Sequence, residues 1–388
     1  MKNYQLITFV SIILTIYSLV NLYIFFKGYG IFPGSQGYKL YYTIIFLILA
    51  LSFIAGKILE VRHSSVFSDI LNITGGFWLG FMLYGFTFLL LSDITGIILR
   101  IPGIINAGNL PEFRKWSFLA MAAISVLLIA GGFVNALIPV VKEYDVTIGK
   151  DAGNTDSLRI AAVSDIHLGS VIRRRSLVKL SRMIEEMKPD LVLLLGDIVD
   201  GELGPVLRSD LLQYFKAPQS KNGLYAITGN HEYIGGAGRT IPYIESKGIR
   251  ILKDETVVLP GGIQLVGRLD RDSFRFNGTE RKPLGELLND IDFSKPVILL
   301  DHQPVHLDES EKHGIDLQLS GHTHNGQLWP LNYITGAVYE LSNGYERKGN
   351  TQIIVSSGYG LWGPRIRLGS RSEVLLINIK FTGNKNVL

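Results

Sequence analysis

The hydrophobic pattern divides the chain into two parts of different character. Four long uncharged runs fill most of the first 141 residues: Asn3–Phe26, Leu40–Gly56, Ile70–Ser92 and Trp116–Val141. A helix needs about 20 mainly apolar residues to cross the hydrocarbon core of a bilayer. Three runs reach that length, and the second gains Tyr38 and Ile58 at its ends. We predict a four-span transmembrane domain at residues 1–143. Buried core helices of a soluble protein are the disfavoured alternative, because these runs offer water little polar surface.

The charges around the runs leave their orientation open. Four spans put both termini on one side of the membrane. Five basic residues would then lie on the side of the termini: Lys2, Lys57, Arg62, Lys142 and Lys150. Five others would lie on the opposite side: Lys27, Lys39, Arg100, Arg114 and Lys115. Since positive charge normally marks the cytoplasmic side, this tie decides nothing. We expect a multi-pass protein of the cell membrane. The side of its C-terminal part is undetermined, with a slight preference for the cytoplasm.

From about Tyr144 the pattern changes to short apolar runs separated by polar helical stretches and glycine turns. Leu158–Val163 and Leu191–Leu195 are typical of buried strands, and Arg174–Met187 between them has helical amphipathic spacing. Further strands are predicted at Leu224–Ile227, Ile263–Val266, Val297–Leu300, Leu317–Leu319, Ile353–Val355 and Val374–Ile379. Residues 144–388 are therefore predicted to form one α/β domain.

Charge and composition remove several classes of function. Residues 1–140 hold 8 basic and 4 acidic side chains, and the remaining 248 residues hold 30 of each. The net charge of +4 therefore lies in the apolar part, and no basic domain exists to bind nucleic acid. The chain has no cysteine, which excludes disulfide scaffolds, zinc–thiolate fingers and thiol nucleophiles.

Side chains that can bind metal follow five of the predicted strands. The first two strands are followed by Asp165 and His167, and by Asp197; the later ones are followed by Asn230 and His231, by His302, and by His322 and His324. Ligands of open α/β sheets bind at the carboxyl ends of strands. Each turn alone is weak support, but five such turns in one domain indicate a metal site.

The types of side chain narrow the chemistry. Imidazole, carboxylate and amide groups without sulfur suit Mn, Fe or Zn, with Mn favoured here. Seven candidate ligands are too many for one ion. Two ions about 3.5–4 Å apart that share a carboxylate can assist an in-line displacement at phosphorus and lower the pKa of water. The sequence therefore predicts two divalent metal ions.

The order of these motifs resembles that of the calcineurin-like metallophosphoesterase superfamily. The order is Asp-x-His, Gly-Asp, Gly-Asn-His-Glu, His and Gly-His-x-His, within about residues 156–380. The run Ser320-Gly-His-Thr-His-Asn-Gly-Gln327 and the tail Gly358–Glu373 are similar to its bacterial membrane-linked branch. The resemblance implies a four-layer α/β/β/α sandwich after the four transmembrane helices.

The resemblance also implies a role for each residue. One metal would take Asp165, His167, Asp197 and His324, and the other would take the bridging Asp197 with Asn230, His302 and His322. His231 would bind no metal and would stabilise the transition state or protonate the leaving oxygen. Two positions depart from the family pattern, Asn325 and Asp301. Gly201 after Asp200 stands where phosphoprotein phosphatases carry arginine, which weighs against a phosphoprotein substrate.

The loop Gly358–Gly363 matches a dinucleotide-binding fingerprint, but Pro364 and Gly369 predict a loop where that fingerprint needs a helix. Arg365 or Arg367 could instead hold phosphate at the pocket. The simpler alternative is that this loop is a surface turn.

We expect a two-metal hydrolase of phosphate ester or pyrophosphate bonds whose substrate is lipid-linked or close to the membrane. The alternative is a membrane scaffold or sensor with an idle phosphoesterase domain. A zinc amidohydrolase is a third interpretation, but an asparagine ligand does not suit it. The sequence leaves the natural substrate, the identity of the metals and the oligomeric state open.

Overall fold

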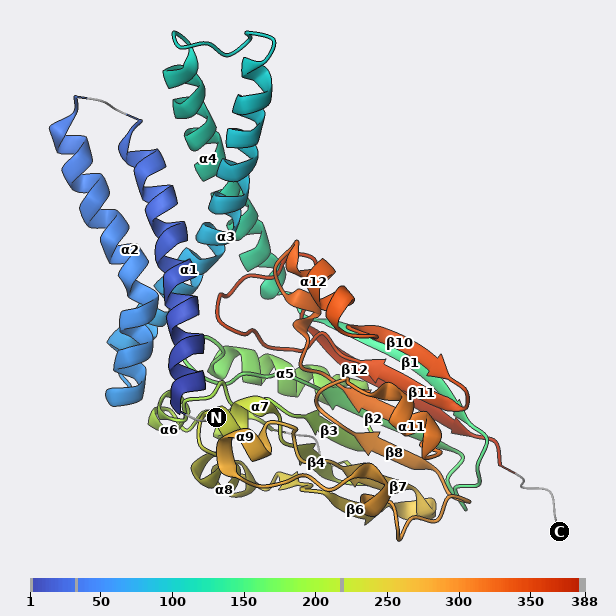
Figure 1. Cartoon of the computed structure of the whole chain (residues 1–388). Coiled ribbons are helices and arrows are strands. Elements are labelled where there is room, and N and C mark those ends of the chain that lie inside the picture. The colour runs from blue at the N-terminus through green and yellow to red at the C-terminus, as the bar shows by residue number, and fades with distance from the viewer. Residues whose placement is uncertain (1–2, 32–33, 217–219, 384–388) are drawn as a thin grey trace. The chain divides into compact units, whose positions relative to one another are not determined.

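A computed structural model of the chain describes residues 3–31, 34–216 and 220–383 (Figure 1). Lys2, which entered the count of flanking charges, lies outside these residues. The chain divides into two compact units. The first comprises Met1–Val134 with Gly363–Ile366, and the second comprises Asn135–Trp362 with Arg367–Leu388. Each unit is described by itself.

The first unit contains four long helices: α1 (Asn3–Tyr29), α2 (Gln36–Arg62), α3 (Val66–Arg100) and α4 (Leu110–Ala136). All four contain segments long and apolar enough to cross a membrane, as predicted. The fourth uncharged run of the sequence extends to Val141. The helix that it forms, however, ends at Ala136, and a strand begins at Val140. Pro139 explains the break, because proline lacks the N–H group that a continuing helix requires.

Aromatic packing and polar contacts fill the interior of the first unit. The rings of Phe46 and Trp78 meet edge to face at 4.9 Å, and Trp78 donates a hydrogen bond to Asn21 at 3.0 Å. Gly75 lets α3 approach α2, since a Cβ there would lie 2.4 Å from the backbone of Phe53. Small residues at such crossings are typical of helices packed in a membrane.

The second unit contains twelve strands among its described residues: β1 (Val140–Ile148), β2 (Ser157–Val163), β3 (Leu191–Leu195), β4 (Leu224–Ile227), β5 (Arg250–Ile251), β6 (Glu255–Val258), β7 (Gln264–Gly267), β8 (Val297–Leu300), β9 (Leu317–Ser320), β10 (Gly344–Lys348), β11 (Thr351–Val355) and β12 (Glu373–Phe381). Its helices are α5 (Arg174–Met187), α6 (Gly204–Arg208), α7 (Asn230–Ile234), α8 (Ala237–Glu245), α9 (Ser273–Asn277), α10 (Leu284–Leu287), α11 (Leu307–Lys312) and α12 (Leu331–Val338). Short 3-10 turns lie at Leu211–Tyr214, Pro260–Gly262 and His324–Gly326.

These strands form two six-stranded sheets, with the orders β1-β12-β2-β3-β4-β5 and β10-β11-β9-β8-β7-β6. All eight predicted strands are present, and α5 and β3 have the predicted bounds. Strands β1, β5, β6 and β10 were not predicted. Their apolar residues are few or are interrupted by charges, as in Lys142, Glu143 and Asp145 of β1.

The sheets pack face to face, and helices cover their outer faces, which gives the expected four layers (Figure 1). Leu193 of β3, Leu300 of β8 and Leu319 of β9 belong to the core between the sheets, and none of them is exposed. Val192 of β3 belongs instead to the core on the other face, where it lies with Leu180 of α5. Alternate residues of a strand point to opposite faces, so one buried strand serves both cores.

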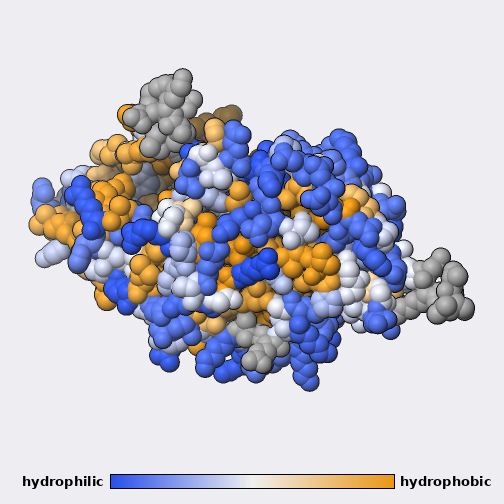
Figure 2. Space-filling model, turned by 90° about the horizontal axis from the view of Figure 1, so that it is seen from below, coloured by the Kyte–Doolittle hydropathy of each residue, from blue (hydrophilic) through white to orange (hydrophobic). Residues whose placement is uncertain are grey.

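The two units differ at their surfaces. The helices of the first unit expose many large aliphatic side chains, such as Leu127, which is 70% exposed. The face of the molecule in Figure 2 instead mixes the two kinds of residue, and hydrophilic ones gather along its lower and upper-right margins. Exposed aliphatic helices are expected where lipid replaces water.

Candidate metal centre

The turns after five strands bring the predicted site residues together. Strands β2, β3 and β4 are parallel neighbours in one sheet, and β8 and β9 are parallel neighbours in the other. Their carboxyl ends are followed by Asp165 and His167, Asp197, Asn230 and His231, His302, and His322 and His324. Five of the seven predicted ligands have positive φ: Asp165, His167, Asp197, His322 and His324. Backbone strain of this kind is concentrated at functional sites, because surrounding structure must maintain it.

The first group of candidate ligands is Asp165, His167 and His324. The Nε2 atoms of the two histidines lie 3.0 Å apart, and Asp165 Oδ1 lies 3.4 Å from His324 Nε2 and 3.8 Å from His167 Nε2. All three residues are buried. Their ligand atoms therefore face one another across a space suited to one ion.

The second group is Asp197, His302 and His322. His302 Nε2 lies 3.2 Å from Asp197 Oδ2. His322 Nδ1 lies 2.9 Å from Asn230 Oδ1, so the predicted amide ligand joins this group. Unlike the other members, His322 is partly exposed.

Asp197 links the two groups. Its Oδ2 atom lies 3.2 Å from His302 of the second group and 3.7 Å from His167 of the first. Its other carboxylate oxygen accepts a hydrogen bond from the backbone of His231 at 2.8 Å, which fixes the orientation of the group. A carboxylate within reach of both groups has the geometry of a bridging ligand.

Two features of the packing fit a pair of metal ions. His302 Nε2 is buried and makes no hydrogen bond within the described part of the chain, although Asp197 lies close to it. A buried polar atom without a partner is costly unless something else binds it. Gly229 closes the site from behind, since a Cβ there would lie 2.2 Å from Asp197 Oδ1. The donor set and its tight packing suit divalent ions.

The electrostatics of the pocket also favour cations. Burial opposes ionisation of Asp165 and Asp197, but the neighbouring histidines hold the pKa of both carboxyls below its usual value. Burial lowers the pKa of His324 to about 3 and that of His322 to about 4. Although burial opposes it, the neighbouring carboxylates raise the pKa of His167 to about 10 and that of His302 above its usual value, so a metal ion would have to displace a proton from these two imidazoles.

His231 lies beside the two groups. Its Nδ1 lies 3.3 Å from Asp200 Oδ1, and its ring stands perpendicular to that of His167 at 4.6 Å. Asp200 Oδ1 also lies 3.1 Å from His167 Nδ1. One carboxylate therefore orients both a candidate ligand and the candidate acid. No role at the site was predicted for Asp200 from the sequence, although its place three residues after Asp197 was a usable signal.

Comparison with known proteins identifies the domain. A family model described as calcineurin-like phosphoesterase matches residues 158–326. An uncharacterized metallophosphoesterase of Aquifex aeolicus is 34% identical over 263 residues, which cover 67% of this chain and 99% of the relative. The chain belongs to the calcineurin-like metallophosphoesterases. It is therefore a metal-dependent hydrolase of phosphoester bonds.

Two further relatives resemble this chain, and one of them is named as a transmembrane protein. An uncharacterized metallophosphoesterase of Campylobacter jejuni is 30% identical over 381 residues, which are 96% of this chain and 98% of the relative. A bovine transmembrane protein with metallophosphoesterase domain is 29% identical over 289 residues, which are 69% of this chain and 64% of the relative. The four apolar helices of this chain and the name of the bovine relative both indicate a membrane protein.

A second carboxylate supports the phosphoesterase site from behind. Glu232 is fully buried and accepts hydrogen bonds from the backbone N–H groups of Asp197, Val199 and Gly229 at 2.7–3.0 Å. Burial, together with the charge of Asp197, raises the pKa of Glu232 to about 7. Glu232 thus ties the turn after β3 to the turn after β4.

Arg367 does not hold phosphate at the pocket. Its side chain is fully buried and donates to the carbonyl oxygens of Ser357, Gly358 and Gly360 at 2.8–3.0 Å. The same nitrogen lies 3.4 Å from His324 Nδ1. Arg367 therefore stabilises the loop behind the first ligand group, and the dinucleotide fingerprint in that loop is an arginine-bound turn.

The structure explains both departures from the family pattern. Asn325 has φ 46° and ψ 44°, a left-handed conformation that asparagine tolerates better than most residues. Asp301 is buried, and Arg281 binds both of its oxygens at 2.8–2.9 Å while Arg268 binds one at 3.1 Å. Neither substitution removes a candidate ligand of this phosphoesterase.

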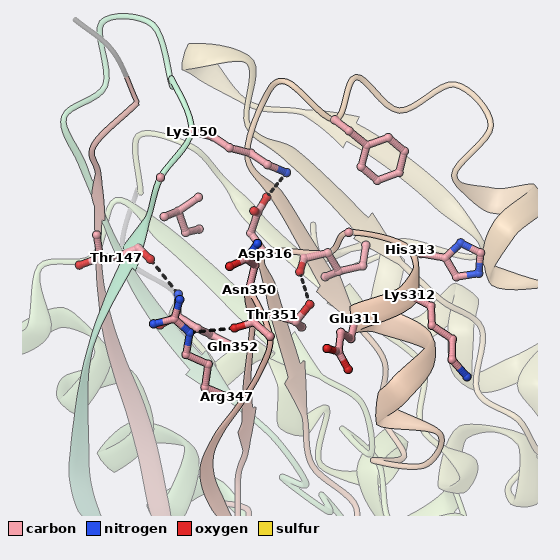
Figure 3. A pocket seen from close by; sticks show the side chains of 16 residues that line it. Thr147, Lys150, Glu311, Lys312, His313, Asp316, Arg347, Asn350, Thr351 and Gln352 are labelled. Carbon is pink, nitrogen blue, oxygen red and sulfur yellow. Dashed lines mark hydrogen bonds and ion pairs between the residues drawn. The ribbon is translucent and has the colours of Figure 1, made fainter.

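A cavity of about 910 Å³ lies elsewhere in the second unit (Figure 3). It is lined by the residues that precede β9 and β11, at the opposite strand ends from the metal centre. Its polar groups bind one another: Lys150 pairs with Asp316 at 2.7 Å, and Gln352 donates to Thr147 at 2.9 Å (Figure 3). We therefore assign the phosphoesterase chemistry to the strand-end turns.

Proposed function

We propose that the chain uses two divalent metal ions to hydrolyse a phosphate ester or pyrophosphate bond of a lipid-linked or membrane-proximal substrate. The position of Asp197 between the two ligand groups is the observation that carries the two-metal part. When bound, the two ions stabilise charge on the phosphate oxygens and lower the pKa of water. The metals are Mn, Fe or Zn, and the mixed oxygen and nitrogen ligands favour Mn.

The ligands divide between the two ions as the family resemblance implies. Asp165, His167 and His324 hold the first ion, and His302, His322 and Asn230 hold the second. Asp197 binds both. The distances within each group support this division, since no ligand other than Asp197 has to reach across the centre.

His231 protonates the leaving oxygen. Asp200 Oδ1 lies 3.3 Å from its Nδ1 atom and so fixes the ring. A positioned donor of this kind contributes about 10²–10⁴-fold to a rate. The side chain of His231 is 13% exposed, so a substrate oxygen can reach it.

The membrane-proximal substrate is inferred from the tether. Helix α4 ends at Ala136 and β1 begins at Val140, so only three residues join the last membrane helix to the first strand. Three residues span roughly 10 Å at full extension. A metal centre on so short a tether meets membrane-borne phosphoesters at a raised effective concentration.

An idle scaffold is the alternative that remains from the sequence. All seven candidate ligands and His231 lie together here, and Gly229 and Glu232 keep the turns in place. A domain without activity has no need to maintain this arrangement.

The test is hydrolysis by the purified full-length protein in lipid nanodiscs. With Mn²⁺ we expect turnover of a soluble aryl phosphodiester, loss of turnover after chelation, and a higher kcat/KM for phosphoesters carried by lipids of the same disc. Inactivity towards every substrate while two ions are bound would support the scaffold. Equal kcat/KM for free and disc-borne substrates would contradict the membrane-proximal part alone.

A further inference from the structure

Helix α12 lacks the charged and buried side chains that are usual for a surface helix of a water-soluble domain. Its sequence, Leu331–Val338, has no charged side chain, and none of its residues is buried. Helix α5 shows the usual arrangement, because it carries six charged side chains and buries Leu177, Leu180 and Ile184 against the core. An uncharged and exposed helix is therefore unexplained by the packing of the second unit.

Large apolar side chains gather on this helix and beside it. The exposed fractions are 68% for Tyr333, 59% for Ile334 and 69% for Val338. Trp329, just before the helix, is 43% exposed, and Trp362 is 59% exposed. We call these five residues the α12 face. Tryptophan and tyrosine are the side chains most enriched where a protein meets the lipid headgroup region.

The α12 face is held firmly next to the metal centre. Trp362 exchanges two hydrogen bonds of 2.9 Å with the side chain of Gln327, three residues after the candidate ligand His324. The backbone of Trp329 donates to Leu368 at 2.6 Å. The exposed side chains therefore project from a fixed base, and solvent exposure is not a consequence of a loose loop.

A cavity lies at the end of this face. It has a volume of about 370 Å³, and its lining includes Val338, Tyr339, Gln303 and Arg271. Gln303 follows the ligand His302 in the chain. The ring of Tyr339 meets that of the ligand His322 edge to face at 6.1 Å. Tyr339 therefore lines the cavity and also meets a candidate ligand, and Arg271 lines the same cavity.

We propose that the α12 face is a membrane-docking surface, with the lipid bilayer as its occupant, and that phosphoester headgroups enter the metal centre through the cavity beside Val338. The proposal rests on the proposed phosphoesterase function. The four membrane-spanning helices of the same chain argue for this occupant, because they keep a bilayer within reach of the domain. Apolar and aromatic side chains that enter the headgroup region bury surface that water would otherwise cover.

The chain has no cysteine, so a single introduced cysteine can carry a probe. We propose Ile334→Cys with a fluorescent label, in full-length protein at one chain per nanodisc. Val258→Cys is the matched control, because Val258 is 67% exposed on β6, far along the chain from α12. Quencher-bearing lipids should quench the label at 334 and leave the label at 258 unaffected. Equal quenching at both positions, or quenching of 334 only by a water-soluble quencher, would overturn the proposal.

A kinetic comparison separates docking from catalysis. Tyr333→Ser with Ile334→Ser should leave turnover of a soluble aryl phosphodiester unchanged and lower kcat/KM for disc-borne phosphoesters by about 10-fold or more, since docking acts through effective concentration. Val258→Ser should change neither value. An equal loss on both substrates would overturn docking. If the unaltered protein hydrolyses nothing, the proposed function fails, and the quenching result still decides whether α12 meets lipid.

Discussion

The two ligand groups of the metal centre are built from similar side chains but are supported differently. In the first group, the second nitrogens of both histidines face charged residues, with Asp200 at His167 and Arg367 at His324. In the second group the support behind His302 is neutral. Its Nδ1 lies 2.7 Å from the carbonyl oxygen of Leu195, and His322 Nδ1 lies 2.9 Å from Asn230, which is itself a candidate ligand.

This difference predicts which of the two ions binds with the higher affinity. Groups behind the ligands fix the orientation of an imidazole and tune its basicity, and a carboxylate does so more strongly than a carbonyl. The first group is also fully enclosed, whereas His322 of the second is partly exposed. We therefore expect a tightly bound first ion and a second ion that exchanges more readily, on the side open to substrate.

Replacing the shared ligand Asp197 should disrupt both metal sites. Asp197→Asn should abolish two-metal binding and turnover while the fold is retained, because a neutral amide cannot compensate two dications. Elemental analysis and circular dichroism test this. Asp316→Asn, which affects a buried carboxylate paired with Lys150 outside the centre, should keep both ions. Two ions per chain with full activity in the Asp197 variant would show that Asp197 is not the bridging ligand.

His231→Ala should leave both ligand groups intact and slow turnover by about 10²–10⁴-fold, the usual contribution of a positioned proton donor. The loss should shrink for substrates with a good leaving group such as nitrophenolate, since these need little protonation. Rate measurements with a series of leaving groups test the role. A variant that loses metal would show that His231 is a ligand.

Asp200→Asn should weaken the first group alone. We expect the affinity of the tighter site to fall by about 10–100-fold, a common result of losing a partner behind a metal ligand. A two-site titration with Mn²⁺ measures both affinities in one experiment. If the weaker site changes instead, the assignment of strong and weak ions to the two groups must be exchanged.

Arg367→Lys should give the smallest effect. Lysine keeps the charge, but it cannot donate at once to Ser357, Gly358 and Gly360, so the loop behind His324 should loosen. We expect a lower melting temperature and a decrease in affinity of the first site smaller than that in the Asp200 variant. Arg365→Lys, two residues earlier in the chain, is the matched control. An unchanged melting temperature in the Arg367 variant would show that the loop does not depend on this guanidinium.

The sequence predicted most of the fold because buried strands of this domain are nearly free of charge. Leu191–Leu195 could hardly be anything else, and its bounds were predicted without error. Strand β1 was missed because it alternates charged and apolar residues at the sheet edge, where it pairs in parallel with β12. A fragment that starts at residue 150 would lack this strand, so an isolated domain must begin before Val140.

The candidate ligands were predictable because each follows a strand end, where local sequence decides the neighbours. The residues behind them were not. Arg367 lies 43 positions from His324 and serves a loop whose carbonyl oxygens carry no signal in the sequence. Tyr339 and the exposed α12 face are likewise invisible to the pattern, because an apolar helical run predicts burial until the structure shows it exposed.

Anomalous diffraction from crystals of the Mn²⁺-bound protein tests the two-metal centre most directly. The account predicts two manganese peaks about 3.5–4 Å apart, with Asp197 between them. One peak should lie among Asp165, His167 and His324, and the other among His302, His322 and Asn230, at lower occupancy in crystals grown with limiting metal. A single peak, or a second peak away from Asp197, would contradict it.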